Sequence, residues 1–314
     1  MKAIILKEFG GVVNLVQKEV IAPQINEKEV LIEVKAFSIN PVDVKTRQGG
    51  AQANRFREQS PIILGWDISG KIVAKGKSVT QFKIGDEVFG MINFPGVGNA
   101  YAEYVVAPSN QIALKPNNIT HEEAAASSMA ALTAWQAFNE YGVLRANETI
   151  LIHGSSGGVG HYAIQIAKYM GAKVIATTST KNKDFVYNLG ADKVIDYKTQ
   201  DFEKILNDID FVLETQGGDN FAKSLNVLKD GGTIINLPSN LTKKSKELAF
   251  EKDFKGSLFM AVKSNGEDMR KIAKLLESKI IKPHISKMFS FDEIQEAHSQ
   301  VESGHTIGKV VVSL

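Results

Sequence analysis

The chain has 314 residues and no cysteine, and its lysines and arginines exceed its aspartates and glutamates by only two. This length is typical of about two domains, and the lack of cysteine excludes disulfides, thiolate nucleophiles and thiolate-bound zinc. Because charges of both signs are interspersed, the sequence shows neither a basic stripe for nucleic acid nor a patch for a membrane surface.

The first 118 residues consist of short apolar runs separated by turn residues. Apolar side chains occupy every second position from Val30 to Ala36, which predicts a strand with one buried face. Similar runs lie at 2–6, 68–74, 87–91 and 101–107. The pattern favours a small antiparallel β-barrel. The first run is too short for a signal peptide and no run could span a membrane, so we expect a cytoplasmic protein.

The character of the sequence changes at Thr120, where Thr120 to Glu123 form a capping-box pattern before helices at 124–129 and 131–141. From Thr149 onward strands alternate with helices, which predicts a doubly wound parallel sheet. The expected strands after the first lie at 173–177, 193–195, 210–213, 232–237 and 258–262, and the helices between them at 182–189, 201–206 and 220–228.

The last part of the chain breaks this rhythm, with expected helices at 268–278 and 291–302 and a strand at 309–313. We expect this part to fold back onto the first domain. The predicted domains are therefore 1–120 with 263–314, and 121–262.

A glycine-rich turn follows the apolar run that begins at Thr149, with glycines at 154, 157, 158 and 160. A diphosphate can approach backbone N–H groups only where no Cβ intrudes, and a helix start offers unpaired donors. The spacing departs from the strict G-x-G-x-x-G pattern, but the strand before and the helix after it match that motif's context. The turn therefore predicts a dinucleotide site; the alternative is a crossover turn without a ligand.

The end of the next expected strand indicates which dinucleotide is bound. A carboxylate there would hold the ribose 2′-hydroxyl of NAD, but none appears before Asp184. The segment instead offers hydroxyls, an amide and ammonium groups, which suit a 2′-phosphate. These are supplied by Thr178, Ser179, Asn182 and Lys183 among others. We therefore expect NADPH; the alternative for Lys181 and Lys183 is an ordinary solvated role.

The six histidines show no ligand spacing, so we predict no metal site. His153 precedes the glycine turn. It either lines the nucleotide site or is a hydrogen-bonded imidazole at a strand end.

Five segments in a fixed order resemble the medium-chain dehydrogenase/reductase superfamily, in its zinc-free quinone oxidoreductase (zeta-crystallin-like) branch. They are residues 38–45, 64–70, 82–88, 131–134 and 153–160. Zinc-dependent relatives carry a cysteine near the Asn40 position and Gly-His-Glu where this chain has Gly65-Trp66-Asp67. Both differences agree with a metal-free site.

The resemblance implies an α/β fold in which a Rossmann domain joins a GroES-like β-barrel catalytic domain, with NADPH in the cleft between them. It implies hydride delivery to a quinone or to the β-carbon of an α,β-unsaturated carbonyl, and a homodimer. By position, the pyrophosphate would meet Ser156, Gly157, Gly158 and Val159, the 2′-phosphate would meet Ser179 and its neighbours, and the adenosine would meet Tyr197. The nicotinamide half would meet Thr133, Leu237, Pro238, Ser239, Phe259 and Met260.

The resemblance also places Asn40, Asp43 and Lys45 at the substrate end. Charge that develops on an enolate or quinol oxygen needs a stabilising group. Asn40 as a donor and Lys45 as a cation are the candidates, although several quinone reductases have a tyrosine in place of Lys45. Asp43 has the alternative role of capping a turn after Pro41, and Trp66 that of a core residue.

Two other functions are compatible with the sequence. The same scaffold could support a zinc-free NADP-dependent alcohol or ketone reductase. A non-catalytic nucleotide-binding protein with a structural or regulatory role, such as RNA binding, is the other, and the near-neutral charge balance argues against RNA.

Overall fold

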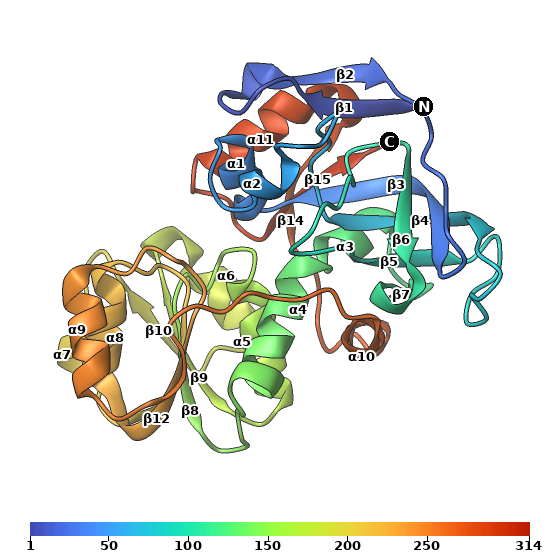
Figure 1. The fold of residues 1–314 in the computed structure, drawn as a ribbon. Helices are drawn as coiled ribbons and strands as arrows, with labels where there is room; N and C mark the ends of the chain where they lie inside the picture. The colour runs from blue at the N-terminus through green and yellow to red at the C-terminus, as the bar shows by residue number, and fades with distance from the viewer. The chain divides into compact units, whose positions relative to one another are not determined.

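A computed structural model describes all 314 residues of the chain. The chain forms two compact units, Met1–Leu132 together with Val262–Leu314, and Thr133–Ala261. Each unit is built on its own large β-sheet (Figure 1). None of the helices combines the length and the apolar character that a membrane crossing requires.

The strands of the first unit are β1 (Lys2–Leu6), β2 (Leu15–Glu19), β3 (Glu29–Ile39), β4 (Asp67–Lys75), β5 (Glu87–Met91), β6 (Tyr104–Pro108), β7 (Ala113–Leu114), β14 (Ile285–Ser290) and β15 (Lys309–Ser313). The main sheet has the order β14-β15-β3-β4-β5-β7, and β6 also pairs with β3. Its pairs are antiparallel except β14 with β15. The predicted alternation in β3 is confirmed, because Val30, Ile32, Val34 and Ala36 are buried.

The helices of the first unit are α1 (Pro41–Arg47), α2 (Ala53–Phe56), α3 (His121–Ala126), α10 (Gly266–Glu277) and α11 (Ile294–Glu302), with short 3-10 turns at Val12–Asn14, Ser109–Gln111 and Phe291–Glu293. The capping box before α3 is confirmed: Glu123 N donates to Thr120 Oγ1 and Thr120 N donates to the Glu123 carboxylate. Because α3 packs on β3, β4 and β15, the first unit extends beyond the expected boundary at residue 120.

The strands of the second unit are β8 (Thr149–Ile152), β9 (Lys173–Thr178), β10 (Lys193–Asp196), β11 (Ile209–Glu214), β12 (Leu228–Asn236) and β13 (Lys255–Ser257). All neighbours are parallel, and the order β10-β9-β8-β11-β12-β13 is that of a doubly wound dinucleotide-binding sheet. The order reverses between β8 and β11. In such sheets ligands bind outside the carboxyl ends of the strands at that point.

Helices cover both faces of this sheet, as predicted. The helices are α5 (Gly160–Tyr169), α6 (Lys183–Asn188), α7 (Phe202–Ile205), α8 (Asp219–Val227) and α9 (Lys243–Glu251), with a π-turn at Ala137–Tyr141 and a 3-10 turn at Thr180–Asn182. Figure 1 shows α5 and α6 on one face and α7, α8 and α9 on the other. The α8 face encloses a core that includes Leu151, Val212 and Phe221. Helix α4 (Met129–Gln136) continues from the first unit into the second.

The expected strand at 258–262 is wrong. The edge strand is β13, whose residues Lys255, Gly256 and Ser257 pair with β12. The apolar run after it stays outside the ladder, with Phe259 53% exposed. Its contacts with β12 are made through Asn236, whose O accepts from Met260 N and whose Nδ2 donates to Leu258 O. Apolar character alone therefore misplaced this strand, because short runs carry no period that separates strand from loop.

Candidate functional site

The glycine-rich turn joins β8 to α5 by a tightly packed backbone. Gly154 has a φ of 58°, and a Cβ there would lie 2.5 Å from the side chains of Thr215 and Gln216. A Cβ on Gly160 would lie 2.4 Å from Gly154 O. Gly157 N donates to that same oxygen at 2.9 Å. Only glycine fits at 154 and 160, because a Cβ at either position would overlap neighbouring atoms of the chain, so the backbone at the start of α5 closes tightly on itself and on the residues after β11.

Three of the predicted cofactor residues meet beside this turn. Ser156 Oγ accepts hydrogen bonds from Thr178 Oγ1 at 3.1 Å and from Asn182 Nδ2 at 3.0 Å. The remaining amide oxygen of Asn182 is buried without a hydrogen-bond partner. Buried acceptors without partners are rare because they are costly, so this oxygen is suited to a ligand hydroxyl. A glycine cradle, a serine hydroxyl and an unpaired amide oxygen fit the phosphate and ribose groups of a dinucleotide.

The expected absence of a carboxylate near the 2′-phosphate segment needs a correction. Asp196 ends β10 and pairs in register with Thr178. It accepts a hydrogen bond of 2.5 Å from Thr180 Oγ1, and Lys183 Nζ lies 3.6 Å from it. The Thr180 hydroxyl, with help from the Lys198 N–H and the Lys183 ammonium, holds the pKa of Asp196 below its usual value. The segment is thus a mixed cluster whose negative charge is partly balanced by Lys183.

The other predicted cofactor residues lie in the same unit. Ser179 is buried, and Tyr197 is 60% exposed with its N–H donating to Thr178 O. Leu237 N donates to Glu214 O, Pro238 O accepts from Asn236 Nδ2, and Ser239 is exposed. The rest are Gly158 and Val159 in the half-buried turn, Thr133 in α4, and Phe259 and Met260 after β13.

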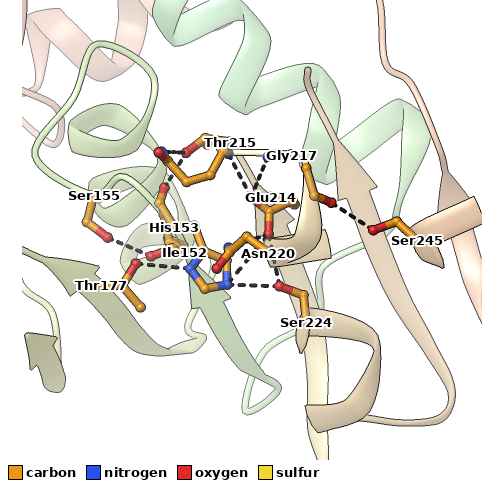
Figure 2. A network of polar contacts seen from close by, with 12 residues as sticks. Ile152, His153, Ser155, Thr177, Glu214, Thr215, Gly217, Asn220, Ser224 and Ser245 are labelled. Carbon is orange, nitrogen blue, oxygen red and sulfur yellow. Dashed lines mark hydrogen bonds and ion pairs between the residues drawn. The ribbon is translucent and has the colours of Figure 1, made fainter. Parts of the chain in front are cut away.

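A buried polar network lies at the point where the strand order reverses, and Figure 2 shows the side chains of His153, Thr177, Glu214, Asn220 and Ser224 pointing toward one another. Glu214, at the end of β11, is fully buried. Its Oε1 accepts from Gln216 N at 2.6 Å and Gly217 N at 3.1 Å. Its Oε2 accepts from Asn220 Nδ2 at 2.8 Å and Ser224 Oγ at 2.9 Å. Glu214 thereby fixes the loop that follows β11 to helix α8.

His153 extends the network to the glycine turn. Its Nε2 lies 3.0 Å from Ser224 Oγ and its Nδ1 lies 3.0 Å from Thr177 Oγ1. Because the Ser224 hydroxyl already donates to Glu214, Nε2 carries the proton and Nδ1 accepts from Thr177. Burial lowers the pKa of His153 and so favours this neutral form. The structure therefore assigns His153 the second of its two expected roles, that of a hydrogen-bonded strand-end imidazole.

In the first unit, the three predicted catalytic residues differ in environment. Asn40 is 4% exposed and precedes α1, while Lys45 lies on the exposed face of that helix. Asp43 is fully buried, and its Oδ2 accepts from Asn40 N at 2.7 Å. Asp43 therefore caps the start of α1, which is the alternative that the sequence left open for it. Burial, followed by the charge of Asp67, raises the pKa of Asp43 to about 7.

The structure adds two charged residues to this region that sequence reasoning missed as site residues. Asp67 and Lys309 are both buried, with Lys309 Nζ 3.8 Å from Asp67 Oδ2. Asp67 also accepts from Ser38 Oγ at 2.6 Å, Asn40 Nδ2 at 2.8 Å and Met129 N at 2.8 Å. Lys309 opens the apolar run of β15. A lone lysine at a strand start is normally solvated, so the sequence around Lys309 gave little indication that this side chain is buried.

Trp66 is a core residue, in agreement with one of its expected roles. It is fully buried, and its Nε1 donates to Gly96 O at 2.8 Å. Its ring makes edge contacts with Phe56 and Phe94. No three acidic or histidine side chains gather at a metal-binding distance.

The sheet order and the glycine cradle define this chain as a dinucleotide-binding α/β protein with an additional β-rich unit. Residues 26–117 match the family model described as an alcohol dehydrogenase GroES-like domain, and residues 189–312 match the one described as a zinc-binding dehydrogenase. The chain belongs to the quinone oxidoreductase branch of the medium-chain dehydrogenase/reductase superfamily. The predicted fold of a Rossmann sheet with a GroES-like domain is confirmed.

Similar proteins span nearly the whole chain. A 2-methylene-furan-3-one reductase of Solanum lycopersicum is 36% identical over 99% of this chain and 79% of its own length. The solved quinone oxidoreductase of Coxiella burnetii is 35% identical, with a TM-score of 0.92, covering 100% of this chain and 99% of its own. The Escherichia coli quinone oxidoreductase complexed with NADPH is 25% identical, with a TM-score of 0.88 and full coverage of both chains.

Proposed function

We propose that this chain is an NADPH-dependent reductase that transfers hydride to a quinone or to the C=C bond of an α,β-unsaturated carbonyl, without zinc. The observation that carries the proposal is the contact of Ser156 with Thr178 and Asn182 beside a cradle that only glycine can form. These groups lie at the carboxyl ends of β8 and β9, next to the reversal of strand order. The named activities of the relatives support the substrate class.

We assign NADPH rather than NADH to the side chains that follow β9. Lys183 and the hydroxyl of Ser179 supply a cation and a donor for a 2′-phosphate. Asp196 holds both Thr180, through its hydroxyl, and Lys183, through its ammonium group, beside this segment. When the 2′-phosphate binds, the Lys183 ammonium group exchanges its contact with the Asp196 carboxylate for a contact with the phosphate dianion.

When bound, NADPH supplies the hydride that reduces the acceptor carbon. The acceptor gains two electrons, and one proton then completes the quinol or the saturated carbonyl product. The chain must exclude water around the reacting atoms and stabilise the oxygen on which charge develops. We assign that stabilisation to the Asn40 side-chain N–H. Lys45, being exposed, is the second candidate.

NADPH oxidation measured with quinones, enals, enones and simple ketones tests the proposal and separates the alternatives. Turnover with quinones or enones supports it. Reduction of simple ketones alone would identify a ketone reductase. Tight NADPH binding without turnover on any acceptor would favour a nucleotide-binding protein without this activity.

The cofactor assignment has its own test in Lys183→Gln. Loss of one partly exposed charged contact to phosphate should raise the Kd for NADPH roughly tenfold and leave that for NADH unchanged. Lys181→Gln is the matched control, because Lys181 is an exposed lysine on the same turn. Equal Kd values for NADPH and NADH in the wild-type protein would contradict the assignment.

Independence from zinc, a homodimer and a cytoplasmic location are further parts of the proposal. The donor set supports the first, because Trp66 and Asn40 occupy the positions at which zinc-dependent relatives carry ligands. The homodimer is supported by β13, which is the edge strand of the second sheet and can therefore pair with the same strand of a second copy. Turnover after dialysis against a chelator, sedimentation and cell fractionation test the three parts in turn.

A further inference from the structure

A buried cluster of Asn40, Asp67 and Lys309 is assembled by strand register in the first unit. Val310 pairs with Ile39 across β15 and β3, and Ser38 pairs with Asp67 across β3 and β4. These pairings place three residues that are far apart in the sequence at the same end of the sheet. Their exposed fractions are only 4%, 0% and 3%, respectively.

The carboxamide of Asn40 is held on both sides by groups of opposite charge. Its Nδ2 donates to Asp67 Oδ2 at 2.8 Å, and its Oδ1 accepts from Lys309 Nζ. In the flipped orientation the NH2 group would face the ammonium and the oxygen would face the carboxylate. Both contacts would then be repulsive, so the charges of the two partners define the amide orientation.

Neither partner is free to turn away. Asp67 also accepts from Ser38 Oγ and Met129 N, and Lys309 Nζ also donates to Ile39 O at 3.3 Å. Nδ2 of Asn40 has two hydrogens, and the structure gives it one acceptor. The second N–H therefore has a fixed direction, and the lysine on Oδ1 draws electron density from the amide and strengthens this donor.

We propose that Lys309 and Asp67 are positioning residues that lock and polarise the Asn40 carboxamide, so that its free N–H donates to the carbonyl oxygen of the substrate. This inference rests on the proposed function and deepens it. Neither charged residue touches the substrate. Lys309 acts through Oδ1, and Asp67 acts through Nδ2 while neutralising the buried lysine.

The first test is a kinetic cycle between Asn40→Ala and Lys309→Met, with hydride transfer followed at saturating NADPH and substrate. Asn40→Ala should lower kcat about a hundredfold, as loss of an oxyanion donor does. Lys309→Met should lower kcat roughly tenfold or more through misplacement of that donor. In the Asn40→Ala background, Lys309→Met should have little further effect, and the Kd for NADPH should stay the same throughout.

A second variant separates positioning from folding. Lys309→Met alone leaves Asp67 buried and unpaired, so we also expect lower stability for it. Asp67→Asn combined with Lys309→Met removes both charges and should regain stability while kcat stays low. Lys309→Arg should restore part of kcat, because it keeps a cation near Oδ1. Arg47→Met is the control for losing another buried cation, since Arg47 pairs with Glu302 in the same unit.

The outcomes distinguish the two proposals. If the wild-type protein oxidises NADPH with none of the quinones or enones as acceptor, the proposed function itself is contradicted. If the wild-type protein is active and the folded Asp67→Asn/Lys309→Met variant keeps the full wild-type kcat, the inference is overturned and the proposed function stands. Effects of Asn40→Ala and Lys309→Met that multiply independently overturn it as well, because they would show that Lys309 does not act through Asn40.

Discussion

Asp43 should make the first unit less stable as the pH rises from about 4 to about 7. In the folded protein burial, then Asp67, raises the pKa of Asp43 from 3.8 to about 7. The folded state thus keeps a proton that the unfolded chain has already lost, so the contribution of Asp43 to the free energy of unfolding falls with pH across this interval. His298 contributes in the opposite direction, because burial lowers its pKa from 6.5 to about 3 in the folded protein. An interval of about three pH units corresponds to about 4 kcal/mol as an upper bound.

Asp43→Asn should remove this contribution, because an amide oxygen still accepts from Asn40 N but does not titrate. Urea unfolding at several pH values between 4.5 and 8, followed by Trp66 fluorescence in a Trp135→Phe background, reports on the first unit. We expect the free energy of unfolding of the variant, relative to that of its parent, to rise as the pH increases. Parallel profiles would refute the reasoning. Asp292→Asn, a change at an exposed acid of the same unit, should leave the profile unchanged.

Two further predictions concern the second unit. Gly160→Ala places a Cβ 2.4 Å from Gly154 O, so we expect a lower Tm and, by calorimetry, weaker binding of NADPH. Gly11→Ala is the control, because its Cβ meets nothing closer than 3.9 Å and should change neither quantity. Glu214→Ala leaves four donors without their shared acceptor and should cost about 3 kcal/mol or more in unfolding free energy. An unchanged urea midpoint would show that water replaces the carboxylate.

The meeting of Ser156, Thr178 and Asn182 in the candidate nucleotide site could be predicted because its determinants are local. The glycines at 154 and 160 sit within one turn, and Ser156, Thr178 and Asn182 lie at the ends of two consecutive strands. Parallel pairing brings such strand ends to one edge of a sheet, so hydroxyls and amides following apolar runs are expected to meet. The same rule, applied to the later strands, would have indicated Asp196 and Glu214, which end β10 and β11.

The environment of the substrate-end residues could not be predicted in this way. Asn40 and Asp43 were identified by resemblance, and their burial depends on contacts with β4, α11 and β15 rather than on neighbouring sequence. Asp43 as a cap follows from its position three residues after Asn40, and the sequence had left that role open. A charge at 309 before an apolar strand is typical of a solvated strand end, and only tertiary pairing shows that it is buried.

This difference has a physical consequence for how the two halves tolerate change. The cradle depends on backbone shape, so a substitution there acts through sterics at one turn and its effect follows from a single Cβ position. The Asn40 cluster depends on the register of three strands, and a shift of one residue in β15 would turn Lys309 to the opposite face of the sheet. Asp67 would then be buried without its cation. The Lys309–Asp67 ion pair therefore makes an incorrect register of β15 unfavourable. The two residues that orient the Asn40 amide thus also select the correct pairing of β15 with β3, which is distant in the sequence.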